Sequence, residues 1–173
     1  MVAENVRERT ISYVRHNVAK GPEAVRDVVR KGQQQVLVLI DGMTEEQAAF
    51  KPNAETWSVI EVLHHVAESH RSLARRCVSL SRGEPAREVR GIGQLDGTPP
   101  TSLAEARTEL KAAHAEMRAF VDSLTPEANT EATLAHSWFG PLNCIEWPVF
   151  QRVHDGDHIN QIEQLKAAPG YPQ

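Results

Sequence analysis

The chain has 173 residues, enough for the hydrophobic core of a single domain spanning residues 1–173 but few for two domains. Its 40% hydrophobic and 24% charged residues are typical of globular proteins, so long disordered stretches are not expected. The net charge is −4, so we expect no nucleic acid as partner. No apolar run could span a bilayer and the N-terminus lacks a secretory signal, so we expect a cytoplasmic protein without a membrane partner.

The first fifty residues predict three helices. Apolar residues at nearly helical spacing indicate a short helix within residues 1–20. A longer amphipathic helix begins after Gly21-Pro22, because proline suits a first helical turn, and it ends at Gly42. The capping-box pattern TEEQ at residues 44–47 then predicts a short helix, which Lys51-Pro52-Asn53 breaks.

Three further long segments follow. A helix is expected over 58–82, where WSVIE is a second capping box, and the glycines and prolines of 83–100 predict a long surface connection. The segment 101–124 reads as the next helix, 125–143 as a loop, and 145–167 as the last helix, with Pro148 tolerated only in its first turn. No strand-like alternation is found, so the sequence predicts an all-α four-helix bundle with an extra short N-terminal helix.

Two cysteines, Cys77 and Cys144, are too few for a disulfide framework. Their spacing is also unlike a CxxC redox or zinc pair. We expect both to be reduced thiols packed in the interior.

The segment HDGDH places His154 and His158 four residues apart on the last helix. Side chains at that separation lie on one face, so two imidazoles can reach one metal ion. A helical wheel of 58–82 places His64 opposite the apolar side, where we expect it to be solvated. His65 lies at the border of the apolar side and His70 near its middle, so the wheel leaves both open as a third ligand.

The order of these motifs resembles the DinB-like superfamily of metal-binding four-helix bundles. The resemblance lies in WSVIEVLHH, with Trp57-Ser58, Glu61 and His65, and in HDGDHINQI, with His154, His158 and Gln161. Phe139-Gly140 and Glu146-Trp147 also fit the family. The resemblance covers roughly residues 22–168. In that family a histidine eight residues after the tryptophan joins the two of an HxxxH motif. The resemblance therefore implies a metal site of His65, His154 and His158.

Three neutral imidazoles leave a divalent ion positively charged and with a coordination position for water, substrate or thiolate, as in catalytic zinc sites. Zinc or nickel suits such ligands better than magnesium or calcium, and manganese and iron stay open. The resemblance implies transfer of a low-molecular-weight thiol (mycothiol, bacillithiol or glutathione) to an electrophilic small molecule. Alternatives are metal-dependent hydrolysis and a non-catalytic bundle that binds metal or ligand. The resemblance also favours a homodimer.

Several polar residues near these motifs have two readings. Asp155 and Asp157 could orient an imidazole, but surface charge is the favoured reading. Glu61 is a weak catalytic candidate whose place in the capping box explains it equally well, and Gln161 could line the cavity or be exposed. Ordinary core or surface roles are expected for His16, His114 and His136, although the loop that carries His136 could overhang the site. Packing at the bundle ends is favoured over a role as substrate platforms for Trp57, Trp138 and Trp147.

Overall fold

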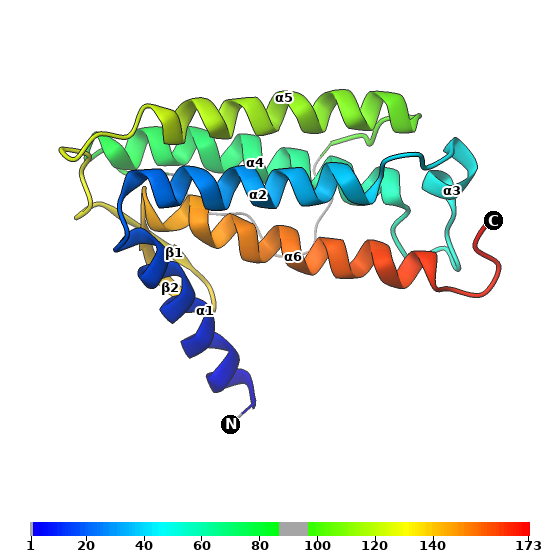
Figure 1. The fold of residues 1–173 in the computed structure, drawn as a ribbon, viewed down its shortest axis with the longest axis horizontal. Helices are drawn as coiled ribbons and strands as arrows, with labels where there is room; N and C mark the ends of the chain where they lie inside the picture. Colours follow the sequence, from blue (N-terminus) through cyan, green and yellow to red (C-terminus); the bar gives the residue numbers. More distant parts are fainter. Residues whose placement is uncertain (1, 87–96) are drawn as a thin grey trace.

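The computed structural model describes residues 2–86 and 97–173, and its long helices form a bundle (Figure 1). The elements in chain order are α1 (Val2–Val18), α2 (Pro22–Leu39), α3 (Glu45–Ala49), α4 (Val59–Ser81), α5 (Leu103–Asp122), β1 (Thr133–His136), β2 (Gly140–Asn143) and α6 (Glu146–Lys166). The predicted four-helix bundle is confirmed, with α2, α4, α5 and α6 as its members. The first helix is longer than the short one expected.

The four bundle helices neighbour one another in the order α2, α5, α4, α6 around the bundle. Figure 1 shows that α4 and α5 run in one direction and that α2 and α6 run in the other. A parallel α4–α5 pair requires a long connection, which agrees with the one predicted over 83–100; residues 87–96 of it lie outside the described part of the chain. Helix α4 therefore packs against α5 on one side and α6 on the other.

Side-chain caps fix where three helices begin. Ser58 accepts a hydrogen bond from the backbone N–H of Glu61, whose carboxylate accepts one from the Ser58 N–H at 2.7 Å, so the predicted capping box is confirmed. Thr44 and Gln47 form the second box at the start of α3. Ser102 caps α5 through the N–H of Glu105. Pro148 lies in the first turn of α6, as expected.

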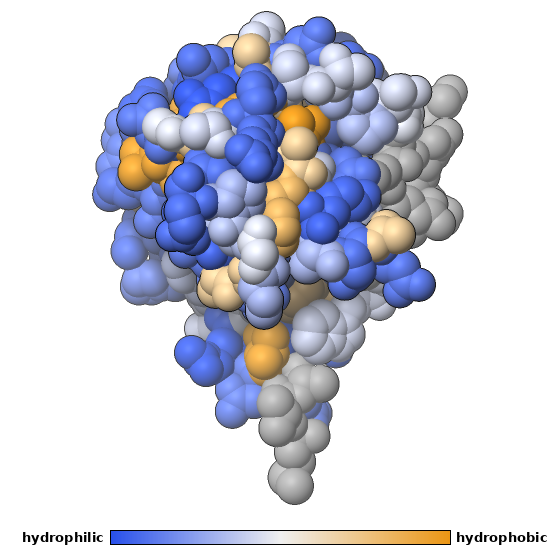
Figure 2. Space-filling model, turned by 90° about the vertical axis from the view of Figure 1, so that its right-hand side faces the viewer, coloured by the Kyte–Doolittle hydropathy of each residue, from blue (hydrophilic) through white to orange (hydrophobic). Residues whose placement is uncertain are grey.

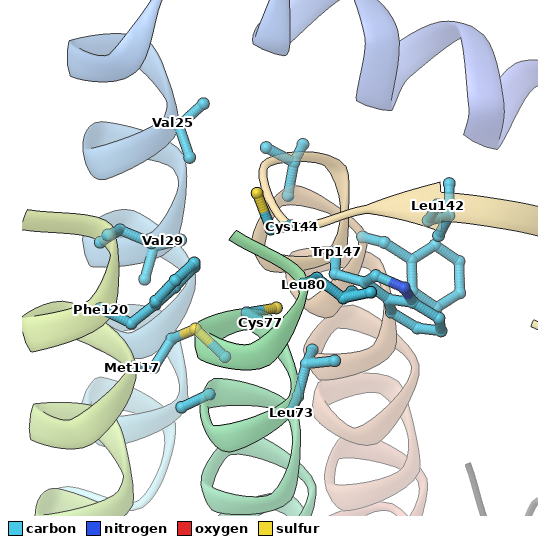
Figure 3. Packing of buried hydrophobic residues seen from close by; sticks show 14 of the residues in the cluster. Val25, Val29, Leu73, Cys77, Leu80, Met117, Phe120, Leu142, Cys144 and Trp147 are labelled. Atoms are coloured by element: carbon cyan, nitrogen blue, oxygen red, sulfur yellow. The ribbon is translucent and has the colours of Figure 1, made fainter. Parts of the chain in front are cut away.

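The core consists of two apolar clusters, one at each end of the bundle. Figure 3 shows part of the first, where side chains of α2, α4 and α5 meet beside the hairpin and the start of α6. Cys77 and Cys144 are buried, free thiols in this cluster, as predicted, and burial raises the pKa of both. Between the clusters lies a layer of buried polar side chains, at least one from each bundle helix: Gln33, His70, His114, Gln151 and Asp155.

The segment expected to be a loop contains an antiparallel hairpin of β1 and β2, and this is a correction. Leu134 pairs with Leu142 across the hairpin, and both side chains are buried. The indole N–H of Trp147 donates to the carbonyl of Leu134 at 3.2 Å, which fastens the hairpin to the start of α6. Four-residue strands with one buried position facing the bundle offer too few repeats for a period-two pattern to stand out.

The end of the bundle seen in Figure 2 is mostly hydrophilic, with an apolar strip near its middle and smaller apolar patches around it. Among the described residues, no helix combines the length and the hydropathy needed to cross a bilayer.

Candidate metal centre

Three histidines converge between α4 and α6. His65 lies in the second turn of α4, and His154 and His158 lie one turn apart in α6. The Nε2 atom of His154 is 3.3 Å from that of His65 and 3.2 Å from that of His158. All three side chains are partly exposed, and each offers one nitrogen within 4.8 Å of the others. The residues named by the resemblance thus form one cluster.

The spacing of these nitrogens fits a shared ion. Zinc–nitrogen bonds are about 2.0–2.1 Å, so two ligands of a tetrahedral centre are separated by roughly 3.3 Å. The two Nε2–Nε2 distances of 3.3 and 3.2 Å match that value. A donor set of three imidazoles also suits zinc or nickel. The cluster therefore fits a divalent ion without rearrangement of the helices.

His158 is held in the orientation that metal binding needs. Its Nδ1 lies 2.8 Å from Oε1 of Gln161, one turn further along α6. An amide oxygen only accepts, so Nδ1 carries the hydrogen and Nε2 presents a lone pair. Burial, and next the proximity of His154, lower the pKa of His158, which favours the neutral imidazole that a metal requires. Of the two readings of Gln161, the structure supports a contact with the site.

Asp155 is buried, so its favoured reading as a surface charge is wrong. Its side chain points into the bundle, where its carboxylate oxygens each lie 3.0 Å from Nε2 of His70. Burial alone would raise the pKa of Asp155, but the neighbouring His70 and His154 hold it well below its usual range. Asp157 is exposed, as expected.

His64 is also buried, which corrects the expectation that it is solvated. Its Nδ1 is 2.9 Å from a carboxylate oxygen of Glu109 in α5. The wheel assumed one apolar side, whereas α4 packs against both α5 and α6. His64 therefore faces α5, and His65 faces α6.

Glu61 lies one turn before His65, and its carboxylate is engaged by the Ser58 N–H and by Nζ of Lys51 at 3.0 Å. Burial raises its pKa, but these hydrogen bonds and the lysine charge outweigh it, so the pKa is lowered. These contacts support the capping role; a catalytic role stays a prediction. The Trp57 ring lies 5.1 Å from the His65 ring and forms a wall of the site.

The remaining histidines lie outside the cluster. His16 is exposed on α1. His114 is fully buried beside His70, with ring centroids 4.7 Å apart, and neither of its ring nitrogens has a hydrogen-bond partner in the described part of the chain. His136 packs at the end of the hairpin against Phe150, and its Nδ1 accepts hydrogen bonds from the N–H groups of Trp138 and Phe139.

A groove of about 620 Å³ lies between α2 and α6, lined by residues such as Val38, Arg152 and Asn160. These α6 residues occupy the face opposite the histidines, so this groove does not open onto the metal cluster. His70, which the wheel left open as a third ligand, lies outside the cluster and contacts Asp155 instead, whereas Gln151 contacts Nδ1 of His154. Neither was predicted to support the site. The signal for Gln151 was its position one turn before His154, and that for His70 was its place on the apolar arc of α4.

Sequence comparison matches residues 29–162 to the family model of the DinB superfamily. The chain is also 23% identical over 143 residues to the uncharacterized protein YuaE of Bacillus subtilis (strain 168), a match that covers 73% of this chain and 88% of YuaE.

Two solved structures share the fold. TT2238, described as a four-helix bundle protein, matches with a TM-score of 0.63 and 21% identity over 86% of this chain and 100% of its own. YfiT from Bacillus subtilis matches with a TM-score of 0.62 and 19% identity over 88% of this chain and 90% of its own. YfiT is described as a probable metal-dependent hydrolase with an unusual four-helix bundle topology.

Proposed function

Because the chain belongs to the DinB superfamily, we propose that it is a divalent-metal-dependent enzyme whose ion is held by His65, His154 and His158. The observation that carries this proposal is the convergence of three Nε2 atoms at separations of 3.2–3.3 Å between neighbours. The three imidazoles are partly exposed, so an ion held by them would be within reach of a small molecule from solvent. A buried carboxylate behind His154 further favours an enzyme over a bundle that merely stores metal.

The leading activity is transfer of a low-molecular-weight thiol to an electrophilic small molecule. A bound divalent ion lowers the pKa of a coordinated thiol or water, so either can react as an anion at neutral pH. In the transfer, sulfur bonds to an electrophilic carbon, the leaving group departs with its bonding electrons, and the thiol proton passes to solvent. Zinc and nickel are the preferred ions.

The side chains around the cluster have separate roles in this reaction. Gln161 keeps the Nε2 lone pair of His158 directed at the ion. Trp57, whose ring lies 5.1 Å from that of His65, is expected to limit access of water on that side. Burial and the nearby His154 lower the pKa of His158, so it stays neutral and bound at neutral pH.

Metal-dependent hydrolysis is the second candidate, supported by the description of YfiT. It uses the same ion and ligands, with water in place of the thiol. Cobalt-substituted protein separates the two activities, because a thiolate bound to Co²⁺ gives an intense near-ultraviolet absorption band. We expect this band on adding glutathione or mycothiol to the wild type and none for His65→Ala. Absence of the band, together with hydrolysis of test esters or amides, would favour the hydrolase.

Metal analysis of the purified full chain tests the site itself. We expect one zinc per chain in the wild type and in His16→Ala, an exposed control. His65→Ala and His158→Ala should retain well under half an equivalent after dialysis. A full equivalent in either variant would remove that histidine from the ligand set.

A further inference from the structure

The polar layer between the two apolar clusters reaches the metal cluster at one point, the α6 segment that carries His154. Asp155 and His70 are each only 1% exposed, and Gln151 is 3% exposed. Burying an ionised carboxylate is costly unless partners compensate for the lost water. A carboxylate so placed next to a metal ligand therefore calls for an explanation beyond packing.

Asp155 is held on two sides. Both of its oxygens lie 3.0 Å from Nε2 of His70, and Oδ1 also accepts a hydrogen bond from the Gln151 amide at 3.1 Å. The Nδ1 atom of His70 is buried, and nothing in residues 2–86 and 97–173 forms a hydrogen bond with it, so the hydrogen of a neutral His70 belongs on Nε2, where it donates to Asp155.

The hydrogen positions on His154 then become important. The Gln151 amide nitrogen is 3.0 Å from Nδ1 of His154 and donates to it, which leaves the hydrogen of His154 on Nε2, inside the histidine cluster. An ion bound through Nε2 requires that hydrogen on Nδ1 instead. Metal binding therefore needs an acceptor for an Nδ1–H group of His154.

Gln151 is a poor acceptor for this hydrogen. Its Oε1 already accepts from the hydroxyl of Ser69 at 3.2 Å, and rotating the amide would turn that oxygen toward the Asp155 carboxylate. Among the residues that the structure describes, the other acceptor beside this nitrogen is Oδ1 of Asp155, 3.8 Å from Nδ1 of His154. A small shift of the imidazole would bring the pair within hydrogen-bond distance.

We propose that Asp155, anchored by His70, is a positioning residue that accepts the Nδ1 hydrogen of His154 and so directs the Nε2 lone pair of His154 at the ion. This inference depends on the metal site of the proposed function, though not on which reaction follows. The hydrogen leaves Nε2 and another is taken up at Nδ1, so the net charge of His154 does not change.

Zinc titration of the full chain against a competing chelator tests the proposal. Asp155→Asn should weaken zinc binding by about 10- to 100-fold, because an amide held by His70 is a poorer acceptor than a carboxylate. Asp157→Asn is the matched control: it removes an exposed aspartate two residues away on the same helix and should change the affinity less than twofold. Equal affinities of Asp155→Asn and Asp157→Asn would overturn the proposal.

A double-mutant cycle separates positioning from general loosening of the fold. If Asp155 acts through His154, then Asp155→Asn has no further effect on the residual zinc affinity of His154→Ala. The same loss in both backgrounds would mean that Asp155 only supports the fold. Imidazole ¹⁵N spectra give a second readout: the His154 hydrogen should move from Nε2 to Nδ1 on zinc binding in the wild type. A hydrogen that stays on Nε2 in the zinc-bound protein would contradict the proposal.

A pair of His70 variants covers the case in which Asp155→Asn does not fold. His70→Gln keeps a donor toward Asp155 and should bind zinc more tightly than His70→Leu, which has none. Equal zinc affinities of the two variants would count against the anchoring role. A wild type that binds no zinc would instead refute the metal site, and so the proposed function itself.

Discussion

At the scale of single residues, the hydrogen bond between His158 and Gln161 decides which imidazole nitrogen is available. The amide oxygen lies 2.8 Å from Nδ1, one helical turn away, and no backbone movement is needed to keep it there. Contacts of this kind fix the orientation of a ligand before the ion arrives, and their loss commonly lowers metal affinity.

Gln161→Leu should therefore weaken zinc binding by about tenfold while leaving the bundle folded. The loss arises because Nδ1 of His158 must then find water as its acceptor. Competition titration measures it, with Gln164→Leu, an exposed glutamine on the same helix, as control. Unchanged affinity in Gln161→Leu would show that the amide is dispensable.

His114 makes the stability of the bundle depend on pH. Burial, with a further contribution from the charge of His70, lowers its pKa from 6.5 to about 3. Between these two values the unfolded chain binds a proton that the folded chain does not. The His114 contribution is thus fully present above about pH 6.5 and is lost as the pH falls toward 3, by up to about 1.4 kcal/mol per pH unit.

We expect His114→Leu to flatten this dependence, since leucine has no proton to bind. At pH 7 the variant should be at least as stable as the wild type, because no described residue hydrogen-bonds to either ring nitrogen of His114 and leucine removes both nitrogens. Urea unfolding from pH 7 to pH 4 gives both comparisons. Parallel stability curves for the two proteins would contradict the assignment of the effect to His114.

At the scale of elements, the start of α4 determines where His65 lies. The capping box of Ser58 and Glu61 begins the helix at Val59, six residues before the ligand. The cap satisfies N–H groups that the first turn leaves without helical partners. His65 therefore lies less than two helical turns from a helix end whose position the cap fixes.

Ser58→Ala should cost about 1 kcal/mol in the free energy of unfolding, the usual loss for an N-cap hydroxyl. Urea denaturation of the metal-free protein measures it. Ser12→Ala, at an exposed position inside α1, is the control and should cost nothing, because alanine is the better helix former. Equal stabilities of the two variants would mean that the cap is redundant.

The helices and their caps could be predicted because each has its own signal along the chain, as at Thr44 and Ser58. The histidine set could be predicted only through the order of motifs, since helical periodicity favoured His70 as strongly as His65. Periodicity failed where an element has more than one buried side: His64 faces α5, and Asp155 faces the core beside His70. The partners of such residues come from other helices, which one helix alone cannot reveal.

At the scale of the whole molecule, the metal cluster joins α4 to α6. His65 is separated by 89 residues from His154, so an ion at this site would link distant parts of the chain. Binding to the folded chain but not to the unfolded one adds to stability according to the ratio of free metal to Kd. The two helices should then separate less readily when metal is present.

Free zinc at about one hundred times Kd should stabilise the wild type by roughly 2.7 kcal/mol. Thermal unfolding with and without zinc measures this as a rise in Tm that a chelator reverses. His154→Ala should show almost no rise, because it removes the ligand common to both short nitrogen–nitrogen contacts. An unchanged Tm of the wild type in the presence of zinc would contradict a site that joins the two helices.

The polar layer between the apolar clusters also sets the lengthwise alignment of the bundle. If α6 slid along its neighbours by one turn, about 5.4 Å, the carboxylate of Asp155 would leave His70 and face aliphatic side chains. An unpartnered charge in such surroundings costs several kcal/mol, so only one register of the helices is tolerated. Apolar contacts alone would permit such slippage; this layer forbids it, and so keeps the imidazoles of two separate helices at the same height along the bundle.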